Sequence, residues 1–234
     1  MTAALIPVKE LAQAKMRLAD VLERRARSEL ALAMLTDVIT ACRESASFDV
    51  IAVVSSDTEA LWHARELGSK PIAEPAALHA TSGAEALNTG LTFAARYLHR
   101  RVGVDEMVIL PADIPLARGA DIRAVAETLA AADGPRMVIA PAADNGTNAL
   151  ALRPPLLIPM RFGRDSAEAH RGAAIDAGVE PAVLDLPALR FDVDSPDDLG
   201  ALDALPVGAA TRGWLDARAS YGAASIPTSA AGDQ

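Results

Sequence analysis

The sequence of 234 residues contains one cysteine, three lysines and very few aromatic residues. A single cysteine, Cys42, excludes an intrachain disulfide and any zinc site built from several cysteines. Aromatic residues make up only 3% of the chain, so its core has to be assembled from aliphatic side chains. The hydrophobic share of 51% is sufficient for such a core and, with 23% charged residues, excludes general disorder.

Long hydrophobic runs are also missing. The apolar stretch at 3–8 is interrupted at Lys9 and is too short for a signal peptide or a membrane span. Basic residues number 22 against 31 acidic ones, which gives a net charge of −9. Such an acidic chain is a poor candidate for binding nucleic acid or an anionic membrane. We therefore expect a cytoplasmic protein with neither kind of partner.

Strand-like and helix-like segments alternate along the chain. Strands are predicted at 3–8, 49–55, 70–73, 107–110, 137–140, 149–152, 183–186 and 190–193. Helices are predicted at 28–43, 58–67, 82–101, 120–131, 166–177 and 196–205. This alternation is typical of a three-layer α/β fold with a mainly parallel central sheet.

No linker or internal repeat divides the chain, so residues 1–218 are expected to form a single domain. Residues 219–234 are mostly small and polar, which predicts a disordered C-terminal tail. The Ala-rich helices are compatible with a homodimer, but they equally reflect a biased composition. The sequence therefore leaves the oligomeric state open.

Two of the three lysines follow the first predicted strand. In an open parallel sheet, ligands bind beyond the carboxyl ends of the strands, which is where Lys9, Lys15 and Arg17 fall. A lysine ammonium is a compact charge suited to phosphate oxygens, and an anionic substrate of this acidic protein needs a local cationic patch. The alternative interpretation is a solvated basic loop.

Carboxylates follow two later strands. Asp113 lies between Pro111 and Pro115, which stiffen the loop, and such a carboxylate can hold a divalent cation bound to phosphate. Asp192 and Asp194 are predicted to share one face of the strand at 190–193, where a metal would relieve their repulsion. The alternatives are an Asp in an ordinary turn for Asp113 and, from Ser195 onward, a capped helix start.

Three further segments carry weaker signals. Asn145-Gly146, just before Thr147, indicates a tight turn between two strands. Ser166 is a candidate cap for a helix that carries His170 one turn further on. The free N–H groups at the start of this helix, together with Gly163 just before it, can bind an anion. A simple hairpin and an ordinary capped helix are the alternatives, and Asn88 is equally explained as a solvated helix position.

Taken together and in order, these segments resemble the guanylyltransferase family of coenzyme F420 biosynthesis. Its members use 2-phospho-L-lactate, phosphoenolpyruvate or 3-phospho-D-glycerate. The matching segments lie at 7–9, 14–18, 32–38, 87–88, 110–115, 146–150, 162–166 and 192–199. Each is weak alone, and their ordered combination is specific. The resemblance implies a nucleotidyltransferase-type Rossmann-like fold over nearly all of the chain to about residue 205.

The resemblance also implies the reaction and the residues that carry it out. GMP passes from GTP to the phospho-acid, pyrophosphate is released, and the product goes to the enzyme that attaches it to the deazaflavin. The implied roles are a Mg²⁺ site at Asp113 and Asp192, nucleotide contacts from Lys9, Lys15, Arg17 and Asn88, and acid contacts from Thr147, Gly163 and Ser166. Lys9, Lys15, Arg17 and Asp113 are the expected catalytic residues.

Several points stay open at this level. Asn145 stands where many relatives carry Gly, and Arg164 lies inside the acid-binding segment, so the preferred acid is undecided. Asp194 is a candidate to replace or join Asp192 as a metal ligand. The alternative functions are another nucleotidyltransferase, acting on molybdopterin or a sugar phosphate, and a non-catalytic nucleotide-binding regulatory module. The first usually has a Gly-rich loop after strand one, which this chain lacks.

Overall fold

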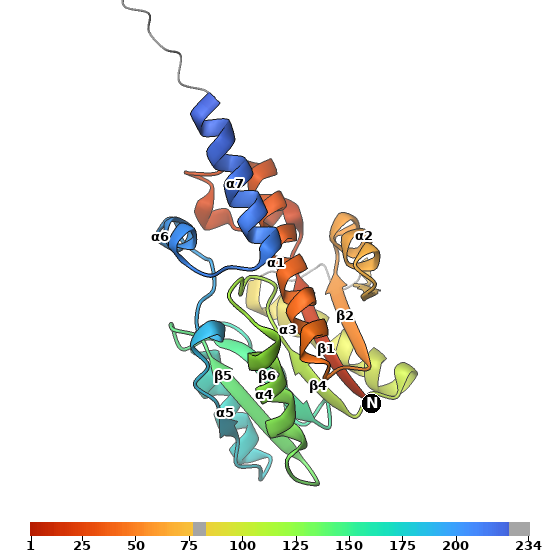
Figure 1. The fold of residues 1–234 in the computed structure, drawn as a ribbon. Helices are drawn as coiled ribbons and strands as arrows, with labels where there is room; N and C mark the ends of the chain where they lie inside the picture. Colours follow the sequence, from red (N-terminus) through yellow and green to blue (C-terminus); the bar gives the residue numbers. More distant parts are fainter. Residues whose placement is uncertain (77–82, 225–234) are drawn as a thin grey trace, which may run out of the picture.

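A seven-stranded sheet of order β3-β2-β1-β4-β6-β5-β7 forms the centre of the protein, in a computed structural model that describes residues 1–76 and 83–224 (Figure 1). The strands are β1 (Thr2–Val8), β2 (Val50–Ser55), β3 (Lys70–Ala73), β4 (Glu106–Ile109), β5 (Arg136–Pro141), β6 (Thr147–Arg153) and β7 (Ala182–Val183). Only β6 runs antiparallel to its neighbours, β4 and β5. The predicted mainly parallel sheet is confirmed.

Helices cover both faces of the sheet (Figure 1). They are α1 (Arg24–Ser45), α2 (Thr58–Glu66), α3 (Gly83–Tyr97), α4 (Gly119–Ala130), α5 (Ser166–Asp176), α6 (Pro196–Ala201) and α7 (Ala209–Ala224). Residues of α3 and α5 pack on one face, and residues of α1, α2 and α4 pack on the other. This arrangement gives the three layers that the alternating pattern predicts.

The buried strands explain why their sequences do not alternate between apolar and polar residues. In β1, Ala3 and Leu5 face the core under α3, whereas Ala4 and Ile6 face the core under α1 and α4. All four side chains are fully buried, because successive residues of a strand point to opposite faces and both faces are covered. Burial of this aliphatic surface is the main term that stabilises the sheet.

A third apolar cluster lies outside the two sheet cores. It joins the segment after β1 to α1, α6 and α7 through Leu18, Leu30, Val193, Leu199 and Leu215, among others. Helix α7 packs along α1 and extends away from the sheet (Figure 1). The cluster thus holds the chain segments that follow β1 and β7 against each other.

The structure corrects several sequence-based expectations. Residues 190–193 form no strand, and β7 is shorter than predicted. The helix predicted to begin at residue 82, which lies outside the described residues, is α-helical to Tyr97 and ends in a π-helical turn, Leu98–Val102. The helix predicted at 196–205 ends at Ala201 and continues as a 3-10 turn, Leu202–Ala204.

Helix α7 is absent from the sequence-based prediction. The sequence predicts a tail from residue 219, but the backbone stays helical to Ala224, and the rest of the expected tail, 225–234, lies outside the described residues. The start of this helix is fixed by a distant residue. Asp37 of α1 accepts hydrogen bonds from the backbone N–H groups of Ala210 and Thr211, at 2.9 Å each. These bonds satisfy donors that a helix start leaves without intrahelical partners.

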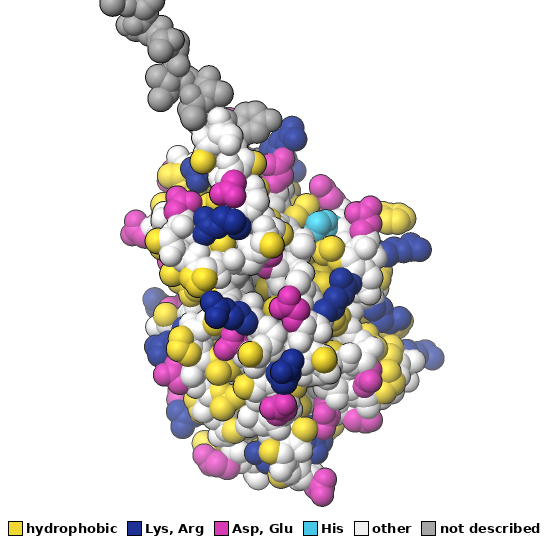
Figure 2. Space-filling model, in the orientation of Figure 1, with side chains coloured by type: hydrophobic (Ala, Val, Ile, Leu, Met, Phe, Trp, Pro, Cys, Tyr) yellow, Lys and Arg dark blue, Asp and Glu magenta, His cyan; other side chains and the backbone are white. Residues whose placement is uncertain are grey.

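The surface agrees with the composition. On the face drawn in Figure 2, acidic and basic side chains are interspersed, and hydrophobic side chains occur singly or in small groups. Within the residues that the structure describes, no helix combines the length and the apolar character needed to cross a membrane.

Candidate functional site

Four chain segments meet at one edge of the sheet. Strand β1 ends at Val8 and the parallel strand β4 ends beside it, so the segments that follow both strands begin at this edge. Because β6 is antiparallel, it starts where β4 ends, and the hairpin from β5 into β6 lies at the same edge. The backbone N–H of Val193 donates to Asp113 O at 3.2 Å and joins the fourth segment, 190–195, to the loop after β4.

Lys15 faces this edge from a short loop between two 3-10 turns, Leu11–Gln13 and Met16–Leu18. Its backbone is left-handed, with φ of 49°, a conformation that non-glycine residues rarely adopt. Arg27, buried in α1, holds the loop on both sides by donating to Ala14 O at 3.2 Å and to Leu22 O at 2.9 Å. The strained backbone is therefore supported by buried hydrogen bonds.

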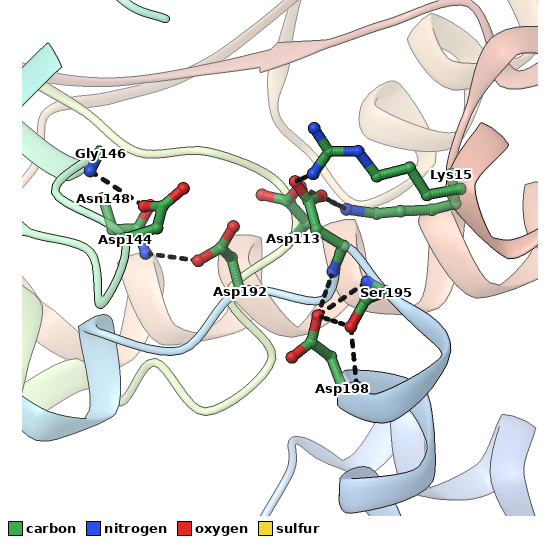
Figure 3. Close-up of polar contacts among 10 residues, drawn as sticks. Lys15, Asp113, Asp144, Gly146, Asn148, Asp192, Ser195 and Asp198 are labelled. Carbon is green, nitrogen blue, oxygen red and sulfur yellow. Dashed lines mark hydrogen bonds and ion pairs between the residues drawn. The ribbon is translucent and has the colours of Figure 1, made fainter. Parts of the chain in front are cut away.

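The Lys15 ammonium binds two carboxylates from distant parts of the chain. Its Nζ donates to Asp113 Oδ2 and, at 3.3 Å, to Asp194 Oδ1, and Arg17 Nη1 lies 3.2 Å from Asp194 Oδ2 (Figure 3). Burial by itself would lower the pKa of Lys15, but the two carboxylates outweigh burial and raise that pKa above its ordinary value. Lys15 is therefore charged, and its side chain is only 9% exposed.

Asp192 lies between Asp113 and Asp144 and points toward the same edge (Figure 3). Burial, followed by the charge of Asp113, raises the pKa of Asp192 to about 6, although a hydrogen bond from Asn148 Nδ2 at 3.3 Å opposes the shift. Asn148 Nδ2 also donates to Leu189 O at 2.8 Å, and this second bond fixes the orientation of the amide toward Asp192. Two adjacent carboxylates that repel each other are suited to share a divalent cation.

The predicted strand face for Asp192 and Asp194 is wrong, because both residues lie in a loop. That loop is held by Asp198, whose Oδ2 accepts from the backbone N–H groups of Asp194 at 3.1 Å and Ser195 at 2.7 Å. Ser195 caps α6 as predicted, and the two side chains form a capping box. Among the described residues, no group of three Asp, Glu, His or Cys side chains is close enough to bind a metal ion. The structure thus brings the carboxylates of Asp113 and Asp194 to Lys15 and places the carboxylate of Asp192 beside them.

A pocket of about 370 Å³ opens beside Lys15. Lys9, Arg17, Asp113 and Asp194 line it together with Lys15. Its remaining lining is mainly apolar: Pro7, Val8, Ala14, Met16, Ala31, Met34, Leu87, Pro111 and Ala112, with the polar Gln13. The structure thus brings the predicted residues Lys9, Lys15, Arg17 and Asp113 to one cavity, in which charged groups lie against an apolar wall.

Thr147 and Ser166 form a second polar group, on the other side of the β5–β6 hairpin from Asn148. Ser166 Oγ donates to Thr147 Oγ1 at 3.0 Å, and His170 Nδ1 lies 3.1 Å from the same Thr147 oxygen. The expectation that Ser166 caps α5 is wrong. Asp165 precedes the helix with a left-handed backbone and makes no cap bond, and Ser166 is the first helical residue.

Asn88 contacts neither the lysines nor the pocket that they line. Its amide binds both backbone polar groups of one residue, donating to Phe162 O at 3.0 Å and accepting from Phe162 N at 2.8 Å. It thereby fixes the backbone next to Gly163, whose φ of 140° favours glycine. A nucleotide-binding role for Asn88 stays a prediction.

Sequence reasoning missed Asn148, His170 and Arg27 as parts of this edge. Asn148 lies inside the segment 146–150 that carries part of the family resemblance, so the sequence did point to its neighbourhood. His170 was considered only as a metal ligand and excluded as such. Arg27 carries no recognisable motif, because its role depends on two backbone carbonyls that only the folded loop presents.

Comparisons with known proteins point to one family. The profile of the family described as "Guanylyl transferase CofC like" matches residues 2–217. Two proteins named phosphoenolpyruvate guanylyltransferase are similar, from Rubrobacter xylanophilus (40% identity, covering 86% of this chain and 93% of the relative) and Rhodococcus jostii (38%, 91% and 92%). A nucleotide-diphospho-sugar transferase from Desulfovibrio desulfuricans shares the fold, with a TM-score of 0.69, 18% identity and coverage of 94% and 95%.

The matches span the whole edge described above, from β1 to the start of α7. The nucleotidyltransferase-type fold that the resemblance implies is confirmed. The chain belongs to the CofC-like guanylyl transferase family and is a nucleotidyltransferase.

Proposed function

We propose that this protein transfers GMP from GTP to the phosphate of a small phosphorylated carboxylic acid, with phosphoenolpyruvate as the first candidate. The observation that carries the proposal is the pocket in which Lys9, Lys15 and Arg17 converge with Asp113. In this acidic protein, two of the three lysines of the chain and Arg17 line the same pocket. Family membership supports guanylyl transfer, and the similar proteins named above carry phosphoenolpyruvate in their names.

The reaction needs no base from the protein. A phosphate oxygen of the acid is already ionised and attacks the α-phosphorus of GTP in line. One phosphorus–oxygen bond forms to the acid as the bond to the β-phosphate breaks, and pyrophosphate leaves with that electron pair. The protein's task is to position the two anions and to neutralise their charge.

The three cations are assigned to the triphosphate. Lys15 is charged, nearly buried and shared by two carboxylates, so it can exchange those carboxylates for phosphate oxygens without losing its proton. Arg17 is exposed and offers several donors that match phosphate oxygens. Lys9, the first residue after β1, lines the same pocket.

Asp113 and Asp192 are assigned to a divalent cation, Mg²⁺ in our proposal. The residues fit such an ion, because carboxylate oxygens are its usual ligands and the raised pKa of Asp192 reports an electrostatic cost that a cation relieves. When bound, Mg²⁺ supplies positive charge to the transferring and leaving phosphates. Asp194, which already contacts Lys15 and Arg17, holds these cations in place rather than the metal.

The acid is assigned to the second polar group, with Thr147 and Ser166 as hydroxyl donors and Gly163 as the close backbone approach. Gly163 and Ser166 lie at the start of α5, where free N–H groups and the helix dipole favour an anion, and Thr147 at the start of β6 is bonded to Ser166. The family resemblance further supports a place in coenzyme F420 biosynthesis, in which the product passes to the deazaflavin-transferring enzyme.

The test is pyrophosphate release from GTP and Mg²⁺ with phosphoenolpyruvate, 2-phospho-L-lactate or 3-phospho-D-glycerate. We expect GTP-dependent release that requires one of these acids. Molybdopterin and sugar phosphates added to the same panel test the other nucleotidyltransferase class. Nucleotide binding without release with any acceptor would support the regulatory alternative and overturn the proposal.

A further inference from the structure

His170 is fully buried in α5 and makes two hydrogen bonds and one ring contact in the predicted acid-binding region. Its Nδ1 lies 3.1 Å from Thr147 Oγ1, and its Nε2 accepts from the backbone N–H of Arg161 at 3.1 Å. Its ring also contacts the ring of Phe162 edge to face, with centroids 4.8 Å apart. Nothing in the reaction described above uses this side chain.

The bond from Arg161 fixes the tautomer of the ring. A peptide N–H can only donate, so Nε2 must be the unprotonated nitrogen. A neutral imidazole then carries its hydrogen on Nδ1, and this hydrogen points at Thr147 Oγ1. Burial, followed by the charge of Arg161, lowers the pKa of His170 to about 4, which keeps the ring neutral.

The fixed tautomer determines how the neighbouring hydroxyls share their hydrogens. Thr147 Oγ1 accepts from His170 and shares one hydrogen bond with Ser166 Oγ, 3.0 Å away. Two hydroxyl hydrogens are thus available for one mutual bond. Whichever hydroxyl donates, one hydrogen is left over among the contacts of the described residues. The pair therefore always keeps one O–H that can donate outward, which suits an anionic oxygen.

We propose that His170 is a positioning residue for the acceptor. It orients the Thr147–Ser166 pair to donate to the carboxylate or phosphate of the phospho-acid. The proposal rests on the proposed function, since these hydroxyls are assigned to the acid there. By accepting from Arg161, the same ring also fixes the segment that leads to Gly163.

Two substitutions separate the two bonds of the ring. In His170→Asn, the side-chain amide can replace Nδ1 as donor to Thr147. In His170→Gln, the amide reaches the position of Nε2 and can replace the bond from Arg161. We expect His170→Asn to keep the KM for the acid within about threefold, and His170→Gln to raise it about tenfold or more, the size of one lost hydrogen bond to a charged group. The KM for GTP is expected to stay unchanged in both.

Thr147→Val completes the test, because it removes the hydroxyl and keeps the shape. In the Thr147→Val background, His170→Gln should raise the acid KM no further, because both changes remove the same hydrogen bond between His170 and Thr147. Equal acid KM values for His170→Gln and the unmodified protein would overturn the proposal. So would a further rise in the double variant.

Nitrogen NMR of the unmodified protein tests the tautomer even where a variant fails to fold. We expect an imidazole protonated at Nδ1, with its Nδ1 signal displaced when the phospho-acid is added. A ring protonated at Nε2 would overturn the proposal. Absence of pyrophosphate release with every acid would instead count against the proposed function, so the two failures are distinguishable.

Discussion

Lys15 and Asp113, 98 positions apart in the sequence, form an ion pair that connects the loop after β1 to the loop after β4. Asp194 completes the arrangement from a third loop. An ammonium shared by two carboxylates therefore lies where we propose that a divalent cation and a triphosphate bind. Lys15 is thus already paired within the protein, so a triphosphate that binds it has to replace these carboxylates.

Removing the Lys15 charge should reduce turnover and make the protein more responsive to metal. In Lys15→Met, Asp113 loses its ion-pair partner and Asp194 keeps only Arg17, so we expect lower thermal stability and turnover reduced by about 10²-fold or more. Because Mg²⁺ can replace the lost charge, it should raise the unfolding temperature of the variant more than that of the unmodified protein.

Lys70→Met is the matched control, because Lys70 lies on β3 over the Tyr97 ring and away from the pocket. It should leave turnover and the response to Mg²⁺ unchanged. Thermal unfolding with and without Mg²⁺ measures the effect. An equal response in Lys15→Met and the unmodified protein would argue against a cation at Asp113.

Asp192→Asn should stabilise the ligand-free protein while reducing its activity. The pKa of Asp192 is raised to about 6, so the folded protein holds this proton more tightly than the unfolded chain does. Stability is therefore lost as the pH rises through about 6, and the substitution restores it. We expect a higher unfolding temperature near pH 8, a difference that fades toward pH 4, and turnover lower by about 10²-fold or more, as for Asp113→Asn.

Asp198→Asn provides a control of opposite sign. Burial by itself would raise the pKa of Asp198, but hydrogen bonds from Ser195 and the backbone outweigh burial and lower it. This substitution should therefore destabilise the protein near pH 8. Unfolding followed across the pH range compares the two, and a destabilised Asp192→Asn would contradict the repulsion on which the metal assignment depends.

Gly208→Ala should destabilise the attachment of α7. A Cβ at Gly208 would lie 2.2 Å from Asp37 Cγ, the carboxylate that binds the first N–H groups of α7. Gly208 N also donates to Pro115 O at 2.9 Å, in the loop that carries Asp113. We expect a loss of about 1–3 kcal/mol in the free energy of unfolding, together with reduced turnover.

Gly213→Ala, inside α7, is the control. Gly213 is exposed, and an added Cβ meets nothing within 4 Å, so higher helix propensity should stabilise the protein by about 0.5–1 kcal/mol. Denaturant unfolding measures both variants. Equal stability of Gly208→Ala and the unmodified protein would mean that Asp37 can move without releasing α7.

The sequence predicts this fold well where local pattern and burial agree. The apolar runs of β1, β2 and β4 identify central strands, and Ser195-Pro196 identifies the start of α6, because each signal lies within a few residues. Predictions fail where distant contacts decide. Helix α7 depends on Asp37, and residues 190–193 form a loop because Asp198 and the backbone of Asp113 hold them.

The same distinction applies to the site. Lys15 and Asp113 are predictable because each follows a strand that ends at a shared edge. Asn88 is harder to interpret, since a polar residue in a helix has no partner until the segment near Phe162 folds against it. Its role is therefore best decided by kinetics.

Asn88→Ala should weaken binding of the phospho-acid rather than of GTP. It removes both hydrogen bonds that fix the backbone of Phe162 next to Gly163, so the proposed acid-binding segment loses its support while Lys15 keeps its own. We expect the acid KM to rise about tenfold and the GTP KM to stay within about twofold. Thr92→Val, one turn along α3, removes only a hydroxyl bonded to Asn88 O and should change neither constant. A raised GTP KM with an unchanged acid KM would instead show that Asn88 acts on the nucleotide, as the family resemblance implies.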